Sequence, residues 1–199
     1  PEVIVVSNRT SDNKPRVYAS HWHTDDSYRE KPATLTFIYP ETLPKNGGGT
    51  DFINCYSVFQ NLPEHLKGKI SNLSAIHKWQ SRRNVSKVAK LSKEQEEETP
   101  EVEHPLIRTH PMSGEKSLYI NPNRIDHIAG FNNPDSDKLL DELYEFSFQS
   151  KFQYSHSYQE GDLVIWDNRC TMHKANSDYD LKQLRVMHRV MLEGEKVYS

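Results

Sequence analysis

Three side chains near the start of the sequence have the types and the spacing to hold a divalent metal ion. His21, His23 and Asp25 alternate in the segment HWHTD, so a strand would present all three on one face. Two imidazoles and a carboxylate suit an ion such as Fe(II), and a set of two histidines and one carboxylate leaves three coordination positions open. The sequence therefore predicts a metal site here, with a further ligand from elsewhere in the chain.

His173 is the best placed of the other histidines to supply that ligand. The chain has 10 histidines, but His173 follows segment 163–169, which reads as a buried strand that runs into a polar turn. Barrel strands commonly present functional groups where they end in such turns. An HxD pair alone is frequent by chance, so a hydrogen-bonded structural histidine stays open as the plainer alternative.

Two arginines lie four residues apart in an apolar, alternating segment near the C-terminus. Arg185 and Arg189 therefore share one strand face and point toward the interior that the strand lines. A buried arginine must be paired, either with a protein carboxylate or with a ligand carboxylate or sulfonate, which the planar guanidinium binds through two hydrogen bonds. The turn GGGT at residues 47–50 is a second candidate for ligand contact, with an ordinary loop as the alternative.

Strands dominate the pattern on both sides of a central helical region. Short β-leaning segments lie close together in the sequence, which indicates antiparallel pairing, and residues 106–120 have the pattern of a hairpin. No strand–helix–strand rhythm is present, so the fold class is mainly β, a barrel or jelly roll that carries helices. The expected strands are residues 2–6, 16–19, 34–39, 51–55, 152–158, 161–166 and 184–192.

Residues 56–104 are expected to form a helical and loop insertion in this barrel. Apolar residues recur every three to four positions over residues 56–70, which predicts one or two short helices. Residues 81–104 are almost entirely polar and form either a solvated loop or a lid over a site. A later helix is predicted after Asn133 and Pro134, where an apolar stripe begins.

Composition excludes several classes of protein. The chain has 25 Lys and Arg residues and 28 Asp and Glu residues. Its net charge of −3 lacks the excess of positive charge that is typical of proteins that bind nucleic acid. No apolar run reaches the roughly 18 residues of a membrane helix, and residues 1–7 do not read as a signal peptide. Two distant cysteines, Cys55 and Cys170, suggest neither a disulfide framework nor a zinc site, so a cytoplasmic location fits best. The first strand begins with no preceding cap, so the chain is expected to start within a domain.

An ordered series of segments resembles the taurine/2,4-dichlorophenoxyacetate dioxygenase family of Fe(II)- and 2-oxoglutarate-dependent enzymes. The resemblance covers essentially the whole chain and implies one domain over residues 1–199 with a double-stranded β-helix, although family members usually carry a substantial N-terminal segment that this chain lacks. The matching segments are WHTDDSY (22–28), GGGT (47–50), HPLIRTHPMSG (104–114), WDNR (166–169), HKAN (173–176) and RVMHR (185–189).

The resemblance also implies a role for each matching residue. It makes His23, Asp25 and His173 the iron ligands and leaves His21 as a neighbour. Thr50 and Arg185 would hold the distal carboxylate of 2-oxoglutarate. The implied substrate residues are Arg189, which corresponds to an arginine that faces the substrate anion, Trp79 by a looser alignment, and Arg124 as a second cationic contact.

The expected reaction is hydroxylation of a small organic anion, of sulfonate or aryloxyalkanoate type, coupled to conversion of 2-oxoglutarate and O2 to succinate and CO2. Gly49 stands where the family often has Asp, and residues 121–124 differ from the taurine-type segment, which leaves the substrate open. Self-association is also left open. The alternatives are a hydroxylase of an amino acid or biosynthetic intermediate, a non-catalytic β-barrel binding module, and a zinc hydrolase with Glu160 or His156 as its general base.

Overall fold

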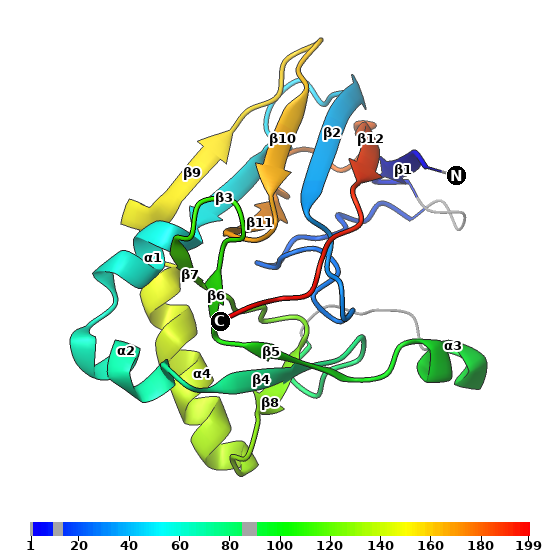
Figure 1. The fold of residues 1–199 in the computed structure, drawn as a ribbon. Coiled ribbons are helices and arrows are strands. Elements are labelled where there is room, and N and C mark those ends of the chain that lie inside the picture. Colours follow the sequence, from blue (N-terminus) through cyan, green and yellow to red (C-terminus); the bar gives the residue numbers. More distant parts are fainter. Residues whose placement is uncertain (1, 10–13, 85–90) are drawn as a thin grey trace.

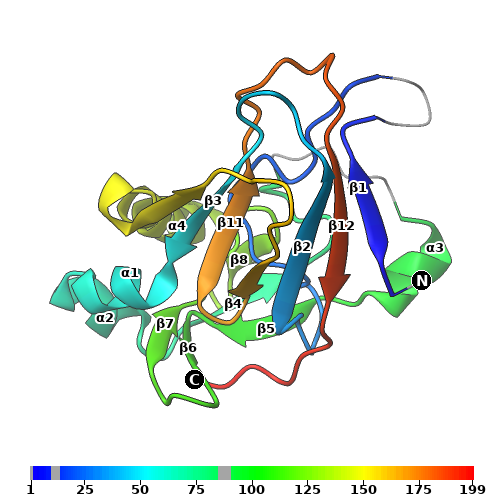
Figure 2. The ribbon, with the colours of Figure 1, turned by 90° about the horizontal axis from the view of Figure 1, so that it is seen from above.

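Two antiparallel sheets form a double-stranded β-helix, or jelly roll, so the predicted fold class is confirmed (Figures 1 and 2). The computed structural model describes residues 2–9, 14–84 and 91–199. The first sheet has the strand order β1-β12-β2-β10, and the second has the order β11-β3-β9. Their bounds are β1 (Ile4–Ser7), β12 (Val186–Met191), β2 (Leu35–Thr42), β10 (Val164–Asp167), β11 (Thr171–Ala175), β3 (Thr50–Asn54) and β9 (Gln153–His156).

A small core joins the inner faces of these two sheets. Ile38, Trp166 and Met187 of the first sheet pack with Phe52 of the second, and all four are at most 8% exposed. The rings of Phe52 and Trp166 meet edge to face with centroids 5.4 Å apart. Because side chains alternate along a strand, the residues two positions away from these four share the same interior.

A larger core lies beside the jelly roll and is built from helices and a third sheet (Figure 1). The helices predicted in residues 56–70 and after Asn133 are present. The long helix begins where the Asn132 side chain accepts a hydrogen bond from the Asp135 backbone N–H at 3.0 Å. None of the described helices is long and apolar enough to cross a bilayer. The elements are α1 (Cys55–Asn61), α2 (Glu64–Ile70), α3 (Lys93–Glu98), α4 (Asn133–Ser147), a 3₁₀ helix (Ser150–Phe152), the sheet β5-β4-β8 (Val102–Pro105, Ser74–His77 and Ile125–Ile128) and the hairpin β6-β7 (Ile107–Thr109 and Lys116–Leu118).

Three details of the predicted strand pattern are wrong. Residues 16–19 form no strand, and residues 21–25 lie outside the named strands as well. Positive φ angles at Ala19 (58°) and Asp26 (54°) turn the chain on either side of the HWHTD segment, which prevents a continuous strand. The sheet β5-β4-β8 was not predicted, because its strands have only four residues each and carry polar side chains.

The polar segment 81–104 contains both loop and regular structure. Arg82 and Arg83 tie the start of the segment to α4 through ion pairs with Asp137 and Asp141. Helix α3 has no buried residue, and β5 pairs with β4. Residues 85–90 lie outside the described part of the chain, so the predicted lid is not tested there.

A buried histidine at the end of β4, in the third sheet, makes stability depend on pH. His77 is 0% exposed, its Nδ1 lies 3.0 Å from Ser27 Oγ, and its ring stacks on Tyr119. Burial, together with the nearby His104, holds the pKa of His77 well below its usual value of 6.5. The unfolded chain takes up a proton near pH 6.5 and the folded chain does not. The stability that neutral His77 confers is therefore complete above pH 6.5 and is lost as the pH falls below it.

We expect His77→Gln to flatten the acid side of the stability profile. Removing one such proton uptake should reduce the pH dependence of the unfolding free energy by about 1.4 kcal/mol per pH unit between pH 6 and pH 5. Denaturant unfolding at several pH values measures this slope. His65→Gln, on the exposed face of α2, is the matched control. Equal slopes for the parent and His77→Gln would contradict the assignment.

Candidate metal centre

His23 and His173 are held side by side by their own backbones. The His23 N–H donates to the His173 carbonyl at 3.0 Å, and the His173 N–H donates to the His23 carbonyl at 2.8 Å. This is an isolated antiparallel bridge between the HWHTD segment and β11. Two residues that exchange both backbone hydrogen bonds project their side chains on the same side. The imidazoles consequently meet, with ring centroids 4.2 Å apart.

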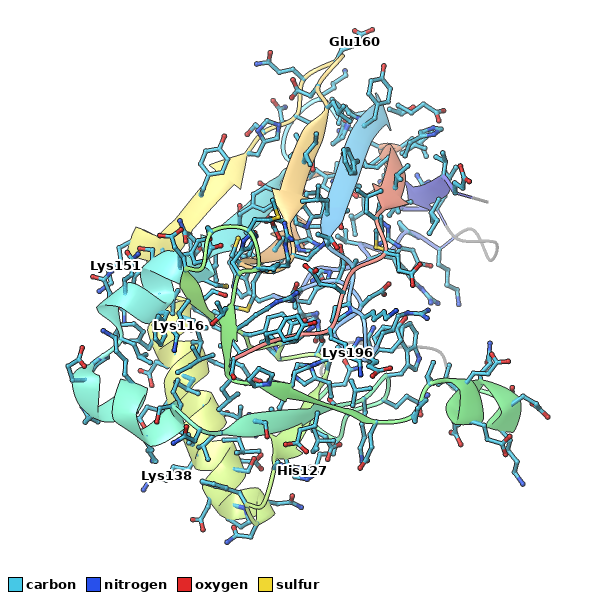
Figure 3. All side chains as sticks on the ribbon, viewed as in Figure 1. Lys116, His127, Lys138, Lys151, Glu160 and Lys196 are labelled. Carbon is cyan, nitrogen blue, oxygen red and sulfur yellow. The ribbon has the colours of Figure 1, made fainter. Side chains whose placement is uncertain are left out.

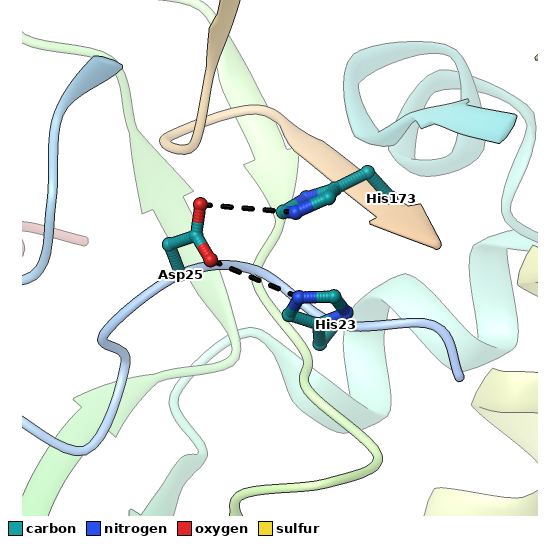
Figure 4. A group of neighbouring side chains, drawn as sticks. All are labelled: His23, Asp25 and His173. Carbon is teal, nitrogen blue, oxygen red and sulfur yellow. Dashed lines mark ion pairs between the residues drawn. The ribbon is translucent and has the colours of Figure 1, made fainter. Parts of the chain in front are cut away.

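Asp25 completes a cluster of three potential metal ligands (Figure 4). One ligand atom from each of His23, Asp25 and His173 lies within 4.8 Å of the others. His23 Nε2 is 3.7 Å from Asp25 Oδ1, and His173 Nε2 is 3.7 Å from Asp25 Oδ2. Both separations are too long for a hydrogen bond. Asp25 and His173 are 6% and 5% exposed, so these polar atoms face one another away from bulk water.

Electrostatics keep the three groups in the protonation states that bind metal. Burial, with the charge of His23 added, lowers the pKa of His173 to about 3, and burial also lowers the pKa of His23. Burial opposes ionisation of Asp25, but its electrostatic interactions with His173, His23 and Arg189 and its hydrogen bond from Thr36 outweigh burial and hold the pKa of this carboxyl below its usual range. Neutral imidazoles and an ionised carboxylate are the forms in which these residues coordinate a cation.

The cluster fits a divalent cation. Two metal–ligand bonds of about 2.1 Å can together span up to about 4.2 Å, which exceeds the 3.7 Å between each imidazole nitrogen and the carboxylate. His23 Nδ1 lies 2.8 Å from the carbonyl of His21, so this nitrogen carries the ring proton and Nε2 keeps its lone pair. His21 therefore orients a ligand through its backbone. Nitrogen and oxygen ligands of this number match the two-histidine, one-carboxylate site of Fe(II) oxygenases.

A buried cation lies on the same interior, at the start of β12. Arg185 is 8% exposed, and its Nε donates to the Gly48 carbonyl at 2.8 Å. Among the described residues, Arg185 forms no ion pair with a carboxylate, and the titratable groups that interact with it are the Tyr158 and Tyr179 phenols, which are neutral at pH 7. Burial lowers the pKa of Arg185, yet a guanidinium stays charged at neutral pH. Since a buried charge requires a partner, this arrangement favours an anionic ligand.

Thr50 lies beside this arginine and on the same sheet face as His173. Across β3 and β11, Phe52 pairs with His173 and Thr50 with Ala175, so all four side chains point the same way. Thr50 is 5% exposed, and its hydroxyl lies 2.9 Å from the Tyr158 hydroxyl. The Arg185 guanidinium in turn lies 5.8 Å from the centre of the Tyr158 ring. The structure thus places Thr50, Tyr158 and Arg185 in one group.

The glycine turn permits this close packing. Gly48 has a φ of +72°, and a Cβ there would lie 3.3 Å from the Cδ of Arg185. At Gly49, a Cβ would overlap the carbonyl oxygen of His156. The turn therefore accommodates Arg185 at Gly48 and the His156 carbonyl at Gly49, because neither residue has a side chain.

Arg189 faces the same interior as the metal cluster. On β2 and β12, Arg189 pairs with Ile38, and Ile38 shares its strand face with Thr36, whose hydroxyl hydrogen-bonds to Asp25. Among the described residues, the buried Nε of Arg189 has no hydrogen-bond partner. The predicted shared face of Arg185 and Arg189 is interrupted, however, because the register of β12 shifts between Val186 and Met187.

Trp79 and Arg124 form a stack near His23. The Arg124 guanidinium lies 4.2 Å from the centre of the Trp79 ring and 5.2 Å from that of Tyr28, and its Nη1 donates to the Trp79 carbonyl at 2.5 Å. The charge of Arg124 is among those that lower the pKa of His23. These contacts give both residues a structural role and leave the predicted substrate contacts as a proposal.

Glu160 and His156, the candidate general bases of a hydrolase, lie outside the metal cluster. Glu160 is exposed in the loop between β9 and β10, at the outer tip of the molecule (Figure 3). His156 Nε2 lies 3.1 Å from Asp162 Oδ2, on that same side. A general base must come within hydrogen-bond reach of the attacked water, and neither residue belongs to the metal cluster.

Sequence reasoning missed residues that support the cluster. Thr36, Asn168 and Tyr158 hydrogen-bond in or next to the site, but single Thr, Asn and Tyr residues have no distinctive spacing in a sequence. Asn168 belongs to the WDNR segment, and the match of this segment to the family was the one feature of the sequence that could have indicated a role for Asn168.

Comparisons with known proteins agree with this geometry. Residues 1–191 match the family described as taurine catabolism dioxygenase TauD, TfdA family. The chain is 36% identical to an alpha-ketoglutarate-dependent 2,4-dichlorophenoxyacetate dioxygenase of Burkholderia sp. (strain RASC), over 88% of this chain and 58% of the relative. It is 33% identical to an alpha-ketoglutarate-dependent sulfate ester dioxygenase of Pseudomonas putida, over 89% of this chain and 60% of the relative.

A solved structure gives the same result for the fold. The crystal structure of AAD-2 in complex with Mn(II) and N-oxalylglycine superimposes with a TM-score of 0.87 at 30% sequence identity, covering 99% of this chain and 76% of that chain. The present chain spans 58% and 60% of the lengths of the two relatives described above. The match to the family over residues 1–191 nevertheless shows that the chain belongs to the TauD/TfdA dioxygenase family.

Proposed function

We propose that this chain is the core of an Fe(II)- and 2-oxoglutarate-dependent dioxygenase that hydroxylates a small organic anion. His23, Asp25 and His173 would hold the iron, and Arg185 with Thr50 would hold 2-oxoglutarate. The observation that carries the proposal is a buried arginine without a carboxylate partner among the described residues, on the same interior as a ligand cluster for a divalent cation. A purely structural ion-pair network does not explain an Arg185 that has no carboxylate partner in the described part of the chain.

Different residues of the chain would bind the metal and 2-oxoglutarate. When bound, Fe(II) supplies redox chemistry with O2 and Lewis acidity. Three protein ligands would leave further coordination positions of the ion open to other groups. Arg185 would neutralise the distal carboxylate of 2-oxoglutarate, and the Thr50 hydroxyl would donate a hydrogen bond to it while Tyr158 orients that hydroxyl. The neighbouring apolar rings of Phe52 and Trp166 exclude water from this interior.

The substrate is proposed to be an anion because of the charges that surround the open side of the cluster. Arg189 faces this interior with an Nε that has no hydrogen-bond partner in the described part of the chain, and Arg124 adds a second positive charge near His23. The relatives are named for 2,4-dichlorophenoxyacetate and sulfate esters, which are both anionic. We therefore propose that the substrate of this chain is a small carboxylate, sulfonate or sulfate ester.

Substrate-stimulated turnover tests the proposed function. The protein is loaded with Fe(II), and 2-oxoglutarate-dependent O2 consumption and succinate formation are measured with a panel of aryloxyalkanoates, sulfonates, sulfate esters and amino acids. At least one anion should raise both rates together in an equal ratio. Stimulation by an amino acid alone would favour the biosynthetic alternative. Turnover of an ester without O2 would favour the hydrolase, and iron-loaded protein with no affinity for 2-oxoglutarate would contradict the proposal.

We expect Arg189→Gln to raise the KM for the anionic substrate by about 10-fold or more, because one charge-assisted hydrogen bond contributes about 1.5–3 kcal/mol. The affinity for 2-oxoglutarate should change by less than about 3-fold, since Arg185 would hold that acid. Steady-state kinetics with each of the two acids varied in turn separates these effects. Arg124→Gln serves as the comparison for a cation already fixed by Trp79. A larger effect on 2-oxoglutarate than on substrate would contradict the assignment of Arg189.

A further inference from the structure

A buried threonine contacts the carboxylate of the metal cluster. Thr36 lies on the inner face of β2 and is 0% exposed. Its Oγ1 donates a hydrogen bond to Asp25 Oδ2 at 2.6 Å. Oδ1 lies 3.7 Å from His23 Nε2 and Oδ2 lies 3.7 Å from His173 Nε2, but only Oδ2 accepts the hydrogen bond from Thr36. The two oxygens of Asp25 therefore have different surroundings.

The direction of this hydrogen bond is fixed by two further residues. Trp166 Nε1, which can only donate, lies 3.1 Å from Asn168 Oδ1. That oxygen also accepts from the Asp25 backbone N–H at 3.3 Å, so the amide group of Asn168 has one orientation and its Nδ2 donates to Thr36 Oγ1 at 2.8 Å. Because Thr36 accepts from Asn168, its own proton is directed to Asp25.

Every member of this chain of hydrogen bonds is well buried. Asn168 is 1% exposed and Trp166 8%. Thr24 anchors the same loop through a hydrogen bond from its hydroxyl to the Asn168 carbonyl at 2.8 Å. Ordered, buried donors of this kind hold a carboxylate in one rotation, and they reduce the basicity of the oxygen that accepts the bond.

We propose that Thr36, oriented by Asn168 and Trp166, is a positioning residue that fixes the rotation of Asp25 and so preorganises this carboxylate for a metal ion. The inference rests on the proposed function, because it concerns how the cluster holds its metal. A carboxylate that is free to rotate must be ordered when a cation binds, which weakens binding. Thr36 would prevent this loss by holding Oδ2.

Titration with Mn(II) alone, in the absence of 2-oxoglutarate, tests the inference. The signal of free Mn(II) in electron paramagnetic resonance gives the dissociation constant for the parent, Thr36→Val and Thr36→Ser. Valine has nearly the same shape but no hydroxyl, so we expect Mn(II) to bind about 10- to 100-fold more weakly. Serine keeps the hydroxyl and should restore the parent affinity to within about 3-fold. Thr34→Val is the matched control, because the hydroxyl of Thr34 donates to the Glu193 carbonyl away from the cluster.

The outcomes separate this inference from the proposed function. If the parent binds Mn(II) and folded Thr36→Val binds it equally well, Thr36 has only a structural role and the inference fails. If the parent itself does not bind Mn(II), the proposed function fails and the inference fails with it. If Thr36→Val does not fold, Asn168→Ala replaces it. That variant leaves the hydroxyl of Thr36 unoriented and should weaken Mn(II) binding in the same direction, and parent-like binding would overturn the inference.

Discussion

Asp25→Ala is expected to lose Fe(II) binding and turnover together. The substitution removes one of the three proposed ligands and the carboxylate of the cluster. Loss of a supporting partner alone typically costs 10- to 100-fold in metal affinity, so loss of a ligand should cost at least about 100-fold. Anaerobic titration with Fe(II), followed by assay of the loaded protein, measures both effects.

The control for this variant must separate loss of metal from loss of the fold. Asp25→Ala also leaves the hydroxyl of Thr36 without its acceptor, which should lower stability by about 1–3 kcal/mol. Circular dichroism therefore accompanies the titration. Glu142→Gln removes an exposed carboxylate of α4 and should bind Fe(II) as the parent does. Parent-like turnover by folded Asp25→Ala would show that the cluster is not the catalytic metal site.

Arg185→Gln is expected to weaken 2-oxoglutarate binding by about 10- to 100-fold while Fe(II) binding stays near that of the parent. The physical reason is the loss of a charge-assisted, two-point hydrogen bond in a buried place. Because the metal ligands come from other segments, high concentrations of 2-oxoglutarate should restore most of the turnover. Titration of iron-loaded protein with 2-oxoglutarate gives the dissociation constant. The dependence of the rate on the 2-oxoglutarate concentration shows how much turnover is restored.

Lys182→Gln is the matched control for Arg185→Gln. It removes a positive charge from the same segment before β12, but its side chain is exposed. We expect no change in the affinity for 2-oxoglutarate. Equal weakening by both substitutions would mean that only the overall positive charge matters, and an unchanged affinity in Arg185→Gln would remove Arg185 from the site.

The sequence contained the ligands of the cluster but not the geometry that unites them. Spacing placed His23 and Asp25 on one strand face, whereas the structure shows a bent segment whose single bridge to β11 aligns His23 with His173. Sequence distance gives no information on which of several histidines will form such a bridge. His173 was singled out because it follows a segment that reads as a buried strand ending in a polar turn, and the resemblance to the family, which matches whole segments, indicated the same residue.

The fold was predictable where apolar residues are periodic and was missed where they are not. Helix α4 has an asparagine cap, an early proline and a buried stripe, which are all local signals. Strand β5, with the sequence VEHP, has no alternation and is defined by its pairing with β4. The hydrogen bonds of Thr36 and Asn168 join residues 132 positions apart, and no local pattern predicts contacts of this kind.

The most direct test of the account is an anaerobic titration of the metal-free protein with Fe(II) and 2-oxoglutarate, monitored in the visible range. A weak charge-transfer band should appear only when both are present, and it should require much more 2-oxoglutarate in Arg185→Gln. This result would establish the cofactor site before any substrate is known. Folded protein that binds Fe(II) but shows no band at any concentration of 2-oxoglutarate would contradict the central claim that His23, Asp25, His173 and Arg185 form one cofactor site.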